Sequence, residues 1–147
     1  MPVYKQGDMW SVFDEVDYFI VTTNSFVKQN GELVMGRGIA KQVRDKFPGI
    51  AAELGQAVKD HSEHLGHYGL VATGKIGAFQ VKFHFKDRAS LELIAENLYR
   101  FAKYAREHSD ISFAMNFPGI GNGGLAPHWI KPLLDQLPDN VQVWSFK

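Results

Sequence analysis

The sequence predicts an α/β fold with a mostly parallel sheet. Its 147 residues suit one domain, and short apolar runs typical of strands alternate with longer stretches of helical spacing. Helices between strands are the crossover connections that parallel strands need. The chain has no stretch near the ~18 uninterrupted apolar residues of a membrane span, so we expect a soluble, cytoplasmic monomer without membrane contact.

The first half of the chain predicts a buried strand and two helices. The apolar run 18–21 ends in the polar residues 22–24, as a central strand would. Apolar side chains recur at helical spacing over residues 39–47, which predicts a helix that ends at Pro48. The same spacing continues in residues 51–64 and predicts a second helix.

The middle of the chain predicts two strands followed by a helix. Residues 69–76 and 79–85 are expected to be strands around Gly77, because apolar and polar residues alternate strictly through the second run. Ser90 is expected to be the N-cap of an amphipathic helix that runs to about residue 108.

The last third predicts a strand, a glycine-rich loop, a helix and a final strand. The strand covers residues 111–117, and the loop covers residues 118–124. Pro127 is suited to the first turn of a helix, which we expect to reach Leu137. Residues 141–145 form the last predicted strand.

Two glycine-rich loops each lead from a strand toward a helix, at residues 35–40 and 119–124. Glycines let the backbone approach a ligand closely, and free N–H groups at a helix start attract phosphate. In an open α/β sheet, ligands gather outside the carboxyl ends of the strands, where both loops would lie. Either loop alone could be a simple connection, but two in one small domain favour a ligand with a diphosphate group.

Several classes of site are excluded or disfavoured. The chain has no cysteine, which excludes thiol nucleophiles, disulfides and Cys-ligated metals. Residues 69–75 spell most of a P-loop, but Ile76 stands where a magnesium-binding Ser or Thr is needed. The second glycine loop comes too late for a Rossmann half to follow it. A formal net charge of zero argues against binding driven by bulk attraction to phosphates.

Other charged groups allow more than one interpretation. The cluster of His61, Glu63, His64 and His67 has no complete ligand set, so we favour a polar helix end over a metal site. The run 41–46 is expected to be an exposed helix face. Lys86, beside Asp87 and Arg88, could be a counter-ion, a nucleophile or a surface charge.

Four segments carry a resemblance to a known family: Val21-Thr22-Thr23-Asn24, Val34 to Gln42, Phe85 to Ser90, and Phe117 to Leu125. With them the chain resembles a macrodomain, the ADP-ribose-binding module. It is most similar to the branch that contains terminal ADP-ribose glycohydrolases and the antitoxin macrodomains that remove ADP-ribose from DNA. The resemblance implies one three-layer α/β/α domain over residues 1–147, with a mixed, mostly parallel central sheet.

The resemblance also implies how the ligand ADP-ribose would be held, with no further cofactor or metal. Asp8 and the Met9 N–H would contact the adenine, which would pack on Phe146. Asn24 would contact the distal ribose, and Lys86 would stand near its anomeric carbon; Lys86 and Asn24 are the implied catalytic residues. Two backbone segments would surround the diphosphate, and they consist of Gly36, Arg37, Gly38 and Ile39 on one side and Gly121, Asn122, Gly123 and Gly124 on the other.

The sequence departs from this branch in one respect. The related glycohydrolases use an Asp in the second glycine loop, but no Asp or Glu occurs between Gly121 and Trp129. His128 is a conceivable substitute or an exposed helix residue. The primary hypothesis is hydrolysis of ADP-ribose from a modified protein or DNA. The alternatives are a non-catalytic ADP-ribose reader and a phosphatase acting on ADP-ribose 1″-phosphate.

Overall fold

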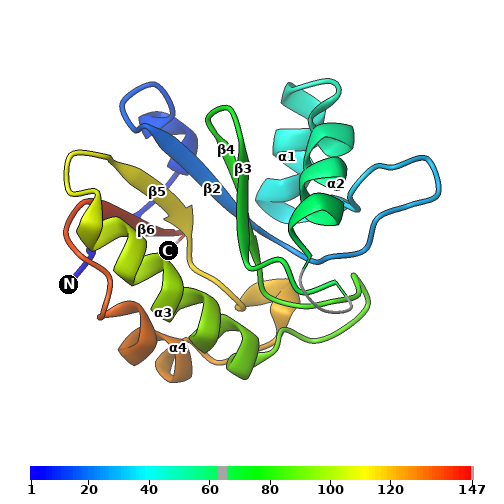
Figure 1. Cartoon of the computed structure of the whole chain (residues 1–147). Coiled ribbons are helices and arrows are strands. Elements are labelled where there is room, and N and C mark those ends of the chain that lie inside the picture. The colour runs from blue at the N-terminus through cyan, green and yellow to red at the C-terminus, as the bar shows by residue number, and fades with distance from the viewer. Residues whose placement is uncertain (63–65, 147) are drawn as a thin grey trace.

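A six-stranded sheet with the order β1-β6-β5-β2-β4-β3 forms the centre of the computed structural model, which describes residues 1–62 and 66–146 (Figure 1). Neighbouring strands are parallel except for β3 and β4, which pair antiparallel. The predicted mixed, mostly parallel sheet is therefore confirmed. The strands are β1 (Val3–Gln6), β2 (Tyr18–Thr23), β3 (Leu70–Thr73), β4 (Ile76–Gln80), β5 (Phe113–Asn116) and β6 (Val141–Ser145).

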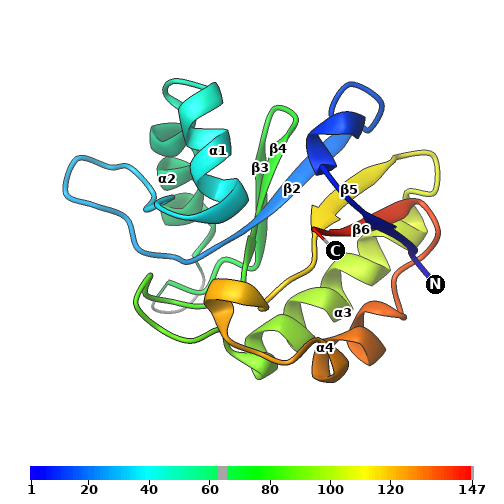
Figure 2. The same ribbon diagram turned by 180° about the vertical axis from the view of Figure 1, so that it is seen from behind.

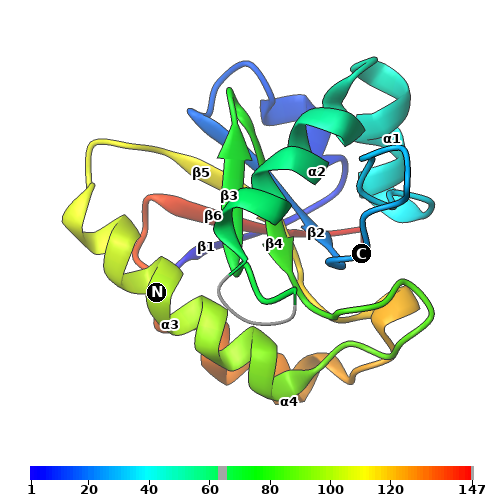
Figure 3. The ribbon, with the colours of Figure 1, turned by 45° about the vertical axis from the view of Figure 1, so that its right-hand side comes forward.

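Helices cover both faces of the sheet. On one face lie α1 (Gly38–Lys46) and α2 (Ile50–His61), and on the other lie α3 (Leu91–Glu107) and α4 (Pro127–Leu134) (Figures 1 and 2). Figure 3 shows α2 packed along β3. Two short 3₁₀ turns, η1 (Met9–Val12) and η2 (Gly121–Gly123), complete the fold. These layers are the α/β/α arrangement that the sequence predicts.

Each face of the sheet has its own apolar core. Val21 of β2 packs with Val43 of α1 and Leu54 of α2. The neighbouring β2 residue, Ile20, belongs to the opposite core, with Ile94 of α3, because successive strand side chains point to opposite faces. A central strand buried on both sides explains why the run 18–21 is continuously apolar.

The Ser90 N-cap is confirmed, since its side chain accepts a hydrogen bond from the Leu93 N–H at 3.2 Å. Helix α3 is further fixed by the buried Asn97, whose Nδ2 donates to the carbonyl of Gln80 at 2.9 Å. Among the described residues, no helix has the length and apolarity that crossing a bilayer requires.

The predicted boundaries of the β3–β4 hairpin were wrong. The chain turns at residues 74–75 rather than at Gly77, and β4 ends at Gln80 rather than at residue 85. Gly77 lies inside β4, where an added Cβ would come within 2.9 Å of Ile20 Cγ1, so this glycine serves close strand packing. Residues 81–90 form a loop in which Phe85 is 40% exposed.

Three other predicted elements also differ from the structure at their ends. Helix α4 ends at Leu134 instead of Leu137, and β5 covers only the centre of the predicted strand 111–117. Helix α2 ends at His61, and Glu63 and His64 lie outside the described residues. Such shifts of a few residues at element ends do not change the topology.

Candidate functional site

A cleft of about 910 Å³ lies at the carboxyl edge of the parallel strands. Its walls come from segments that directly follow β1, β2, β4, β5 and β6. This is the position in which open α/β sheets bind ligands. Both glycine-rich loops open into the same cleft, as the sequence predicts.

The cleft gathers all of the predicted site residues except Gly124. Those that line it are Asp8, Met9, Asn24, Gly36, Arg37, Gly38, Ile39, Lys86, Gly121, Asn122, Gly123 and Phe146. Gly124 is exposed and does not line the cleft; it has a φ of +78°, and a Cβ there would come within 3.1 Å of Arg88 Nε. Its need for glycine therefore arises from backbone conformation and close packing.

The first glycine loop presents an open backbone. Arg37 is the N-cap residue of α1, but its side chain makes no capping hydrogen bond. The first N–H groups of an α-helix have no intrahelical partner, so those of α1 are available to an anion. A Cβ added at Gly36 or Gly38 would have no heavy atom within 4 Å, and Gly38 has a φ of +59°. Packing within the protein therefore does not require a glycine at position 36.

Asn24 anchors the segment that faces this loop. Its Oδ1 accepts from the Phe26 N–H at 2.8 Å, and its Nδ2 donates to the Val34 carbonyl at 3.1 Å. The side chain is 6% exposed, and its backbone carbonyl accepts from the buried Tyr68 hydroxyl at 2.8 Å. An amide nitrogen carries two hydrogens, so Asn24 has donor capacity beyond the bond to Val34.

The opposite end of the cleft is built by Asp8 and Phe146. Asp8 Oδ1 accepts from the Trp10 N–H at 3.0 Å and so caps η1. The Trp10 indole N–H donates to Gln42 Oε1 at 2.6 Å, which ties η1 to α1. Phe146 follows β6 and is 76% exposed. A carboxylate acceptor and an accessible ring are suited to a heteroaromatic base with an amino group.

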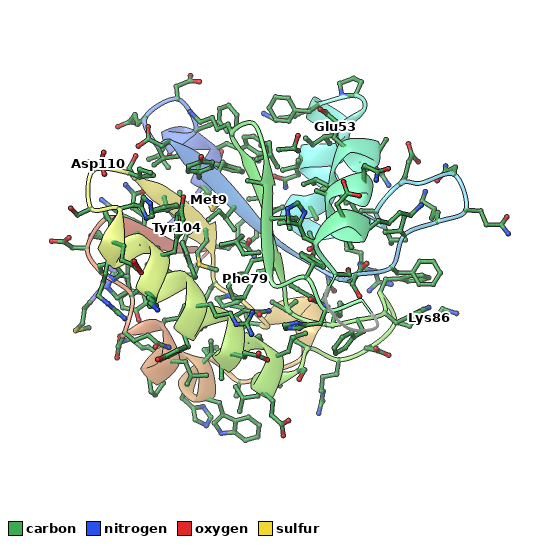
Figure 4. The ribbon with its side chains drawn as sticks, viewed as in Figure 1. Met9, Glu53, Phe79, Lys86, Tyr104 and Asp110 are labelled. Atoms are coloured by element: carbon green, nitrogen blue, oxygen red, sulfur yellow. The ribbon has the colours of Figure 1, made fainter. Side chains whose placement is uncertain are left out.

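Two lysines line the far end of the cleft. Lys86 is exposed, and Figure 4 shows it well separated from Met9. Lys82 is half-buried, and its Nζ donates to the carbonyls of Phe85 at 3.3 Å and Asp87 at 3.2 Å. Burial lowers the pKa of the Lys82 ammonium; the negative charge of Asp87 raises it and the positive charge of Arg37 lowers it.

Lys82 was missed by the sequence reasoning because the alternating pattern of residues 79–85 placed it in the middle of a strand. The structure ends β4 two residues earlier and turns Lys82 into the cleft. Asp87 also lines the cleft, and its Oδ2 accepts from the His84 N–H at 3.1 Å. Of the described residues that line the cleft, Asp8 and Asp87 are the carboxylates.

Asn116 and Thr22 are further cleft residues that were not predicted. Asn116 Oδ1 accepts from the Thr22 N–H at 3.0 Å, and its Nδ2 donates to Thr22 Oγ1 at 2.9 Å. The pair joins the ends of β5 and β2 beneath the cleft. A polar residue that ends an apolar strand run was the available signal.

No histidine among the described residues lines the cleft. His128 is exposed at the start of α4 and does not line the cleft. His61 Nδ1 lies 2.8 Å from the Ala57 carbonyl, and His67 Nε2 lies 3.7 Å from Glu96. Within residues 1–62 and 66–146, no three potential metal ligands come together.

No family model matches the chain. A DNA ADP-ribosyl glycohydrolase of Mycobacterium tuberculosis is 30% identical over 116 residues, which cover 72% of this chain. The protein of the same name from Mycobacterium bovis is similar to the same degree. The chain spans 33% of the length of these curated relatives.

The structure of the macrodomain of Mycobacterium tuberculosis DarG superimposes with a TM-score of 0.71 and 28% identity, over 98% of this chain and 97% of that one. The chain is a macrodomain of the DarG branch. The macrodomain of Thermus aquaticus DarG is 23% identical, with a TM-score of 0.70, and covers 98% of its own chain and 100% of this one. The structure of Thermosipho africanus DarTG in complex with ADP-ribose is 24% identical and has a TM-score of 0.72. The match covers 94% of this chain and 39% of that one.

Proposed function

We propose that this macrodomain binds ADP-ribose in the cleft and hydrolyses the bond that joins it to modified DNA. The observation that carries the proposal is the order of groups along one cleft. Asp8 and Phe146 follow the neighbouring strands β1 and β6, the two glycine loops come after the adjacent strands β5 and β2, and the lysines come after β4, the next strand in the sheet. This order matches adenine, diphosphate and distal ribose. DNA is the modified macromolecule named for the curated relatives.

Backbone groups account for most of the diphosphate binding. The N–H groups at the start of α1 and in the second glycine loop supply partial positive charge without a cluster of cations. A protein of zero net charge can therefore hold a dianion. Arg37 lines the same wall and adds one full positive charge beside the first glycine loop.

A lysine supplies the chemistry at the distal ribose. Lys86 is the residue implied by the family resemblance, and Lys82 is the residue whose environment favours a reactive amine. The lowered pKa of Lys82 leaves more of it neutral at a given pH, and a neutral amine can attack an anomeric carbon. The bond from that carbon to the DNA would break, with its electron pair leaving on the DNA, and water would then release ADP-ribose from the lysine. Protonated, either lysine stabilises negative charge on the departing group. Detection of ADP-ribose covalently attached to one lysine, by mass spectrometry, distinguishes attack from charge stabilisation.

The second glycine loop lacks a carboxylate, so Asp87 is the acidic group nearest to these lysines in sequence and on the cleft wall. A general base of this kind contributes ~10²–10⁴-fold to a rate. The missing loop carboxylate also favours a second candidate function, a reader that binds ADP-ribose groups without cleaving them. Such a reader binds free ADP-ribose and releases none from a substrate.

The test is to incubate the macrodomain with ADP-ribosylated DNA and ADP-ribosylated protein and to measure free ADP-ribose. We expect the wild type to release ADP-ribose from DNA. This release should be lost in Lys82→Ala or in Lys86→Ala. It should be retained in Lys103→Ala, because Lys103 is an exposed lysine of α3 outside the cleft. Binding of free ADP-ribose without release would assign the reader function. Phosphate release from ADP-ribose 1″-phosphate, with no release from DNA, would assign the phosphatase.

The proposal includes a cytoplasmic protein that acts as a monomer. Light scattering coupled to size exclusion measures the mass in solution, and a dimer would contradict this part of the proposal.

A further inference from the structure

Gln42 of α1 lines the cleft with an amide group that is held in one orientation. Its Oε1 accepts from the Trp10 indole N–H at 2.6 Å. An indole nitrogen is a donor only, so the amide has to present its oxygen to Trp10 and turn its Nε2 elsewhere. Within residues 1–62 and 66–146, the bond to Trp10 is the one hydrogen bond of this exposed side chain. Both hydrogens of the Gln42 amide therefore remain available to a ligand in the cleft.

Trp10 is itself fixed by aromatic packing. Its ring stacks on the buried Phe19, with centroids 4.5 Å apart and planes at 28°. The rings of Phe13 and Phe47 lie 5.4 Å and 6.2 Å from it. A group whose position is set before binding loses little conformational entropy when a ligand arrives. The donor of Gln42 is thus oriented before any ligand enters.

Two connections place Gln42 between the first glycine loop and the Asp8 end of the cleft. Gln42 follows Gly38 by four residues, so it lies on the same face of α1 one turn further on, about 6 Å along the helix axis. Trp10, to which Gln42 is bonded, donates its backbone N–H to Asp8 Oδ1 at 3.0 Å. Asp8, Gly38 and Gln42 all line the cleft. A ligand whose diphosphate lies at the start of α1 and whose base reaches Asp8 passes Gln42.

Adenine offers hydrogen-bonding groups that match this donor. Its 6-amino group is a donor, and its ring nitrogens N1, N3 and N7 are acceptors. Asp8 carries a carboxylate and can take only the amino group of the base. An amide donor on the neighbouring wall supplies the complementary partner for a ring nitrogen. Of the residues of α1 beyond its first turn, Gln42 is the one that lines the cleft.

We propose that Gln42 is a base-recognition residue, whose Nε2 donates a hydrogen bond to a ring nitrogen of the adenine. The inference rests on the proposed function and deepens it, because it names a side chain besides Asp8 that reads the base. Trp10 acts through Gln42 as a positioning residue, since its indole N–H sets which way the amide faces.

The test is a calorimetric titration with ADP-ribose and with three analogues in which CH replaces N1, N3 or N7. Gln42→Met keeps the length of the side chain and removes the amide. We expect it to weaken ADP-ribose binding about 2- to 10-fold, the contribution of one hydrogen bond. One analogue should bind the wild type more weakly by a similar factor. Gln42→Met should bind that analogue as tightly as ADP-ribose, because the two changes remove the same interaction.

Two further variants separate recognition from folding. Gln42→Glu keeps an oxygen for the Trp10 indole and exchanges the donor for an acceptor, so it should fold with the wild-type Tm and still weaken ADP-ribose binding. Gln56→Met is the matched control, because Gln56 is an exposed glutamine of α2 outside the cleft. It should leave the Kd of all four ligands unchanged.

The inference is overturned if Gln42→Met binds ADP-ribose as tightly as the wild type. It is also overturned if each analogue loses the same factor in Gln42→Met as in the wild type, since the amide would then contact the ribose or the solvent instead of the base. Failure of the wild type to bind ADP-ribose at all would instead overturn the proposed function, so the two failures are distinguishable.

Discussion

Replacing Tyr68 by Phe tests the support beneath the ribose end of the cleft. The Tyr68 side chain is buried, and its hydroxyl donates to the Asn24 carbonyl at 2.8 Å and contacts the Thr23 hydroxyl. Phenylalanine fills the same space but leaves both partners without this hydroxyl. Burial also raises the pKa of Tyr68 far above its ordinary value, so the hydroxyl stays protonated and remains a donor at any pH used in an assay.

A buried polar group without a partner costs about 1–3 kcal/mol. We therefore expect Tyr68→Phe to lower the free energy of unfolding by about 1–3 kcal/mol, which for a chain of this size lowers Tm by roughly 2–12 °C. Differential scanning calorimetry and urea unfolding measure the two quantities. ADP-ribose affinity should also fall, because Asn24 loses the bond that fixes its backbone under the ligand.

Tyr99→Phe provides the control, because Tyr99 is 64% exposed on α3 and its hydroxyl reaches solvent. That variant should unfold as the wild type does. If Tyr68→Phe also unfolded within about 0.5 kcal/mol of the wild type, the change would be no larger than that of an ordinary surface substitution. The hydroxyl would then not be the support that the hydrogen bonds indicate.

Three further substitutions address the cleft itself. In a pH–rate profile, the rate of ADP-ribose release should rise with pH up to the lowered pKa of Lys82, because the neutral amine is the attacking form. Lys82→Arg should lack this rise, because a guanidinium stays protonated. Between the lowered pKa of Lys82 in the folded protein and its ordinary value of ~10.4, Lys82 binds fewer protons in the folded chain than in the unfolded chain. The contribution of Lys82 to the free energy of unfolding should therefore increase with pH across this range. Gly36→Ala should weaken ADP-ribose binding in calorimetry without changing Tm, because no protein atom lies near the added methyl group. Gly74→Ala is the contrasting variant, because Gly74 has a φ of +59° in the β3–β4 turn. It should lower Tm and leave ADP-ribose binding unchanged. Phe146→Ala should weaken ADP-ribose binding about tenfold, because the adenine loses its stacking partner, and should leave ribose 5-phosphate binding unchanged. Unchanged ADP-ribose affinity in this variant would show that the adenine does not stack on Phe146.

The fold could be predicted from the sequence because its signals are local. The apolar run of β2, the helical spacing of α1 and the N-cap of α3 each depend on a few neighbouring residues. The alternation of these elements then implies parallel pairing with helices on both faces. The two glycine loops were placed in one cleft by the same rule.

The end of β4 could not be predicted in this way, because it depends on a partner strand. Gln80 is the last residue of β4 and pairs with Thr23, the last residue of β2. Beyond Thr23 the regular ladder stops, and only the bonds from the Val81 N–H to the Thr23 carbonyl and from Ser25 to the Phe83 carbonyl join the two segments. Residues 81–85 therefore do not continue the strand despite their alternating pattern. Lys82 was missed for this reason, and Phe85 reaches the surface for the same reason.

The most direct measurement is a crystal structure of the macrodomain with ADP-ribose. We expect the diphosphate between residues 36–39 and 121–123, the adenine between Asp8 and Phe146, and the anomeric carbon of the distal ribose within reach of Lys82 or Lys86. ADP-ribose bound in the reverse direction, or outside this cleft, would contradict the account.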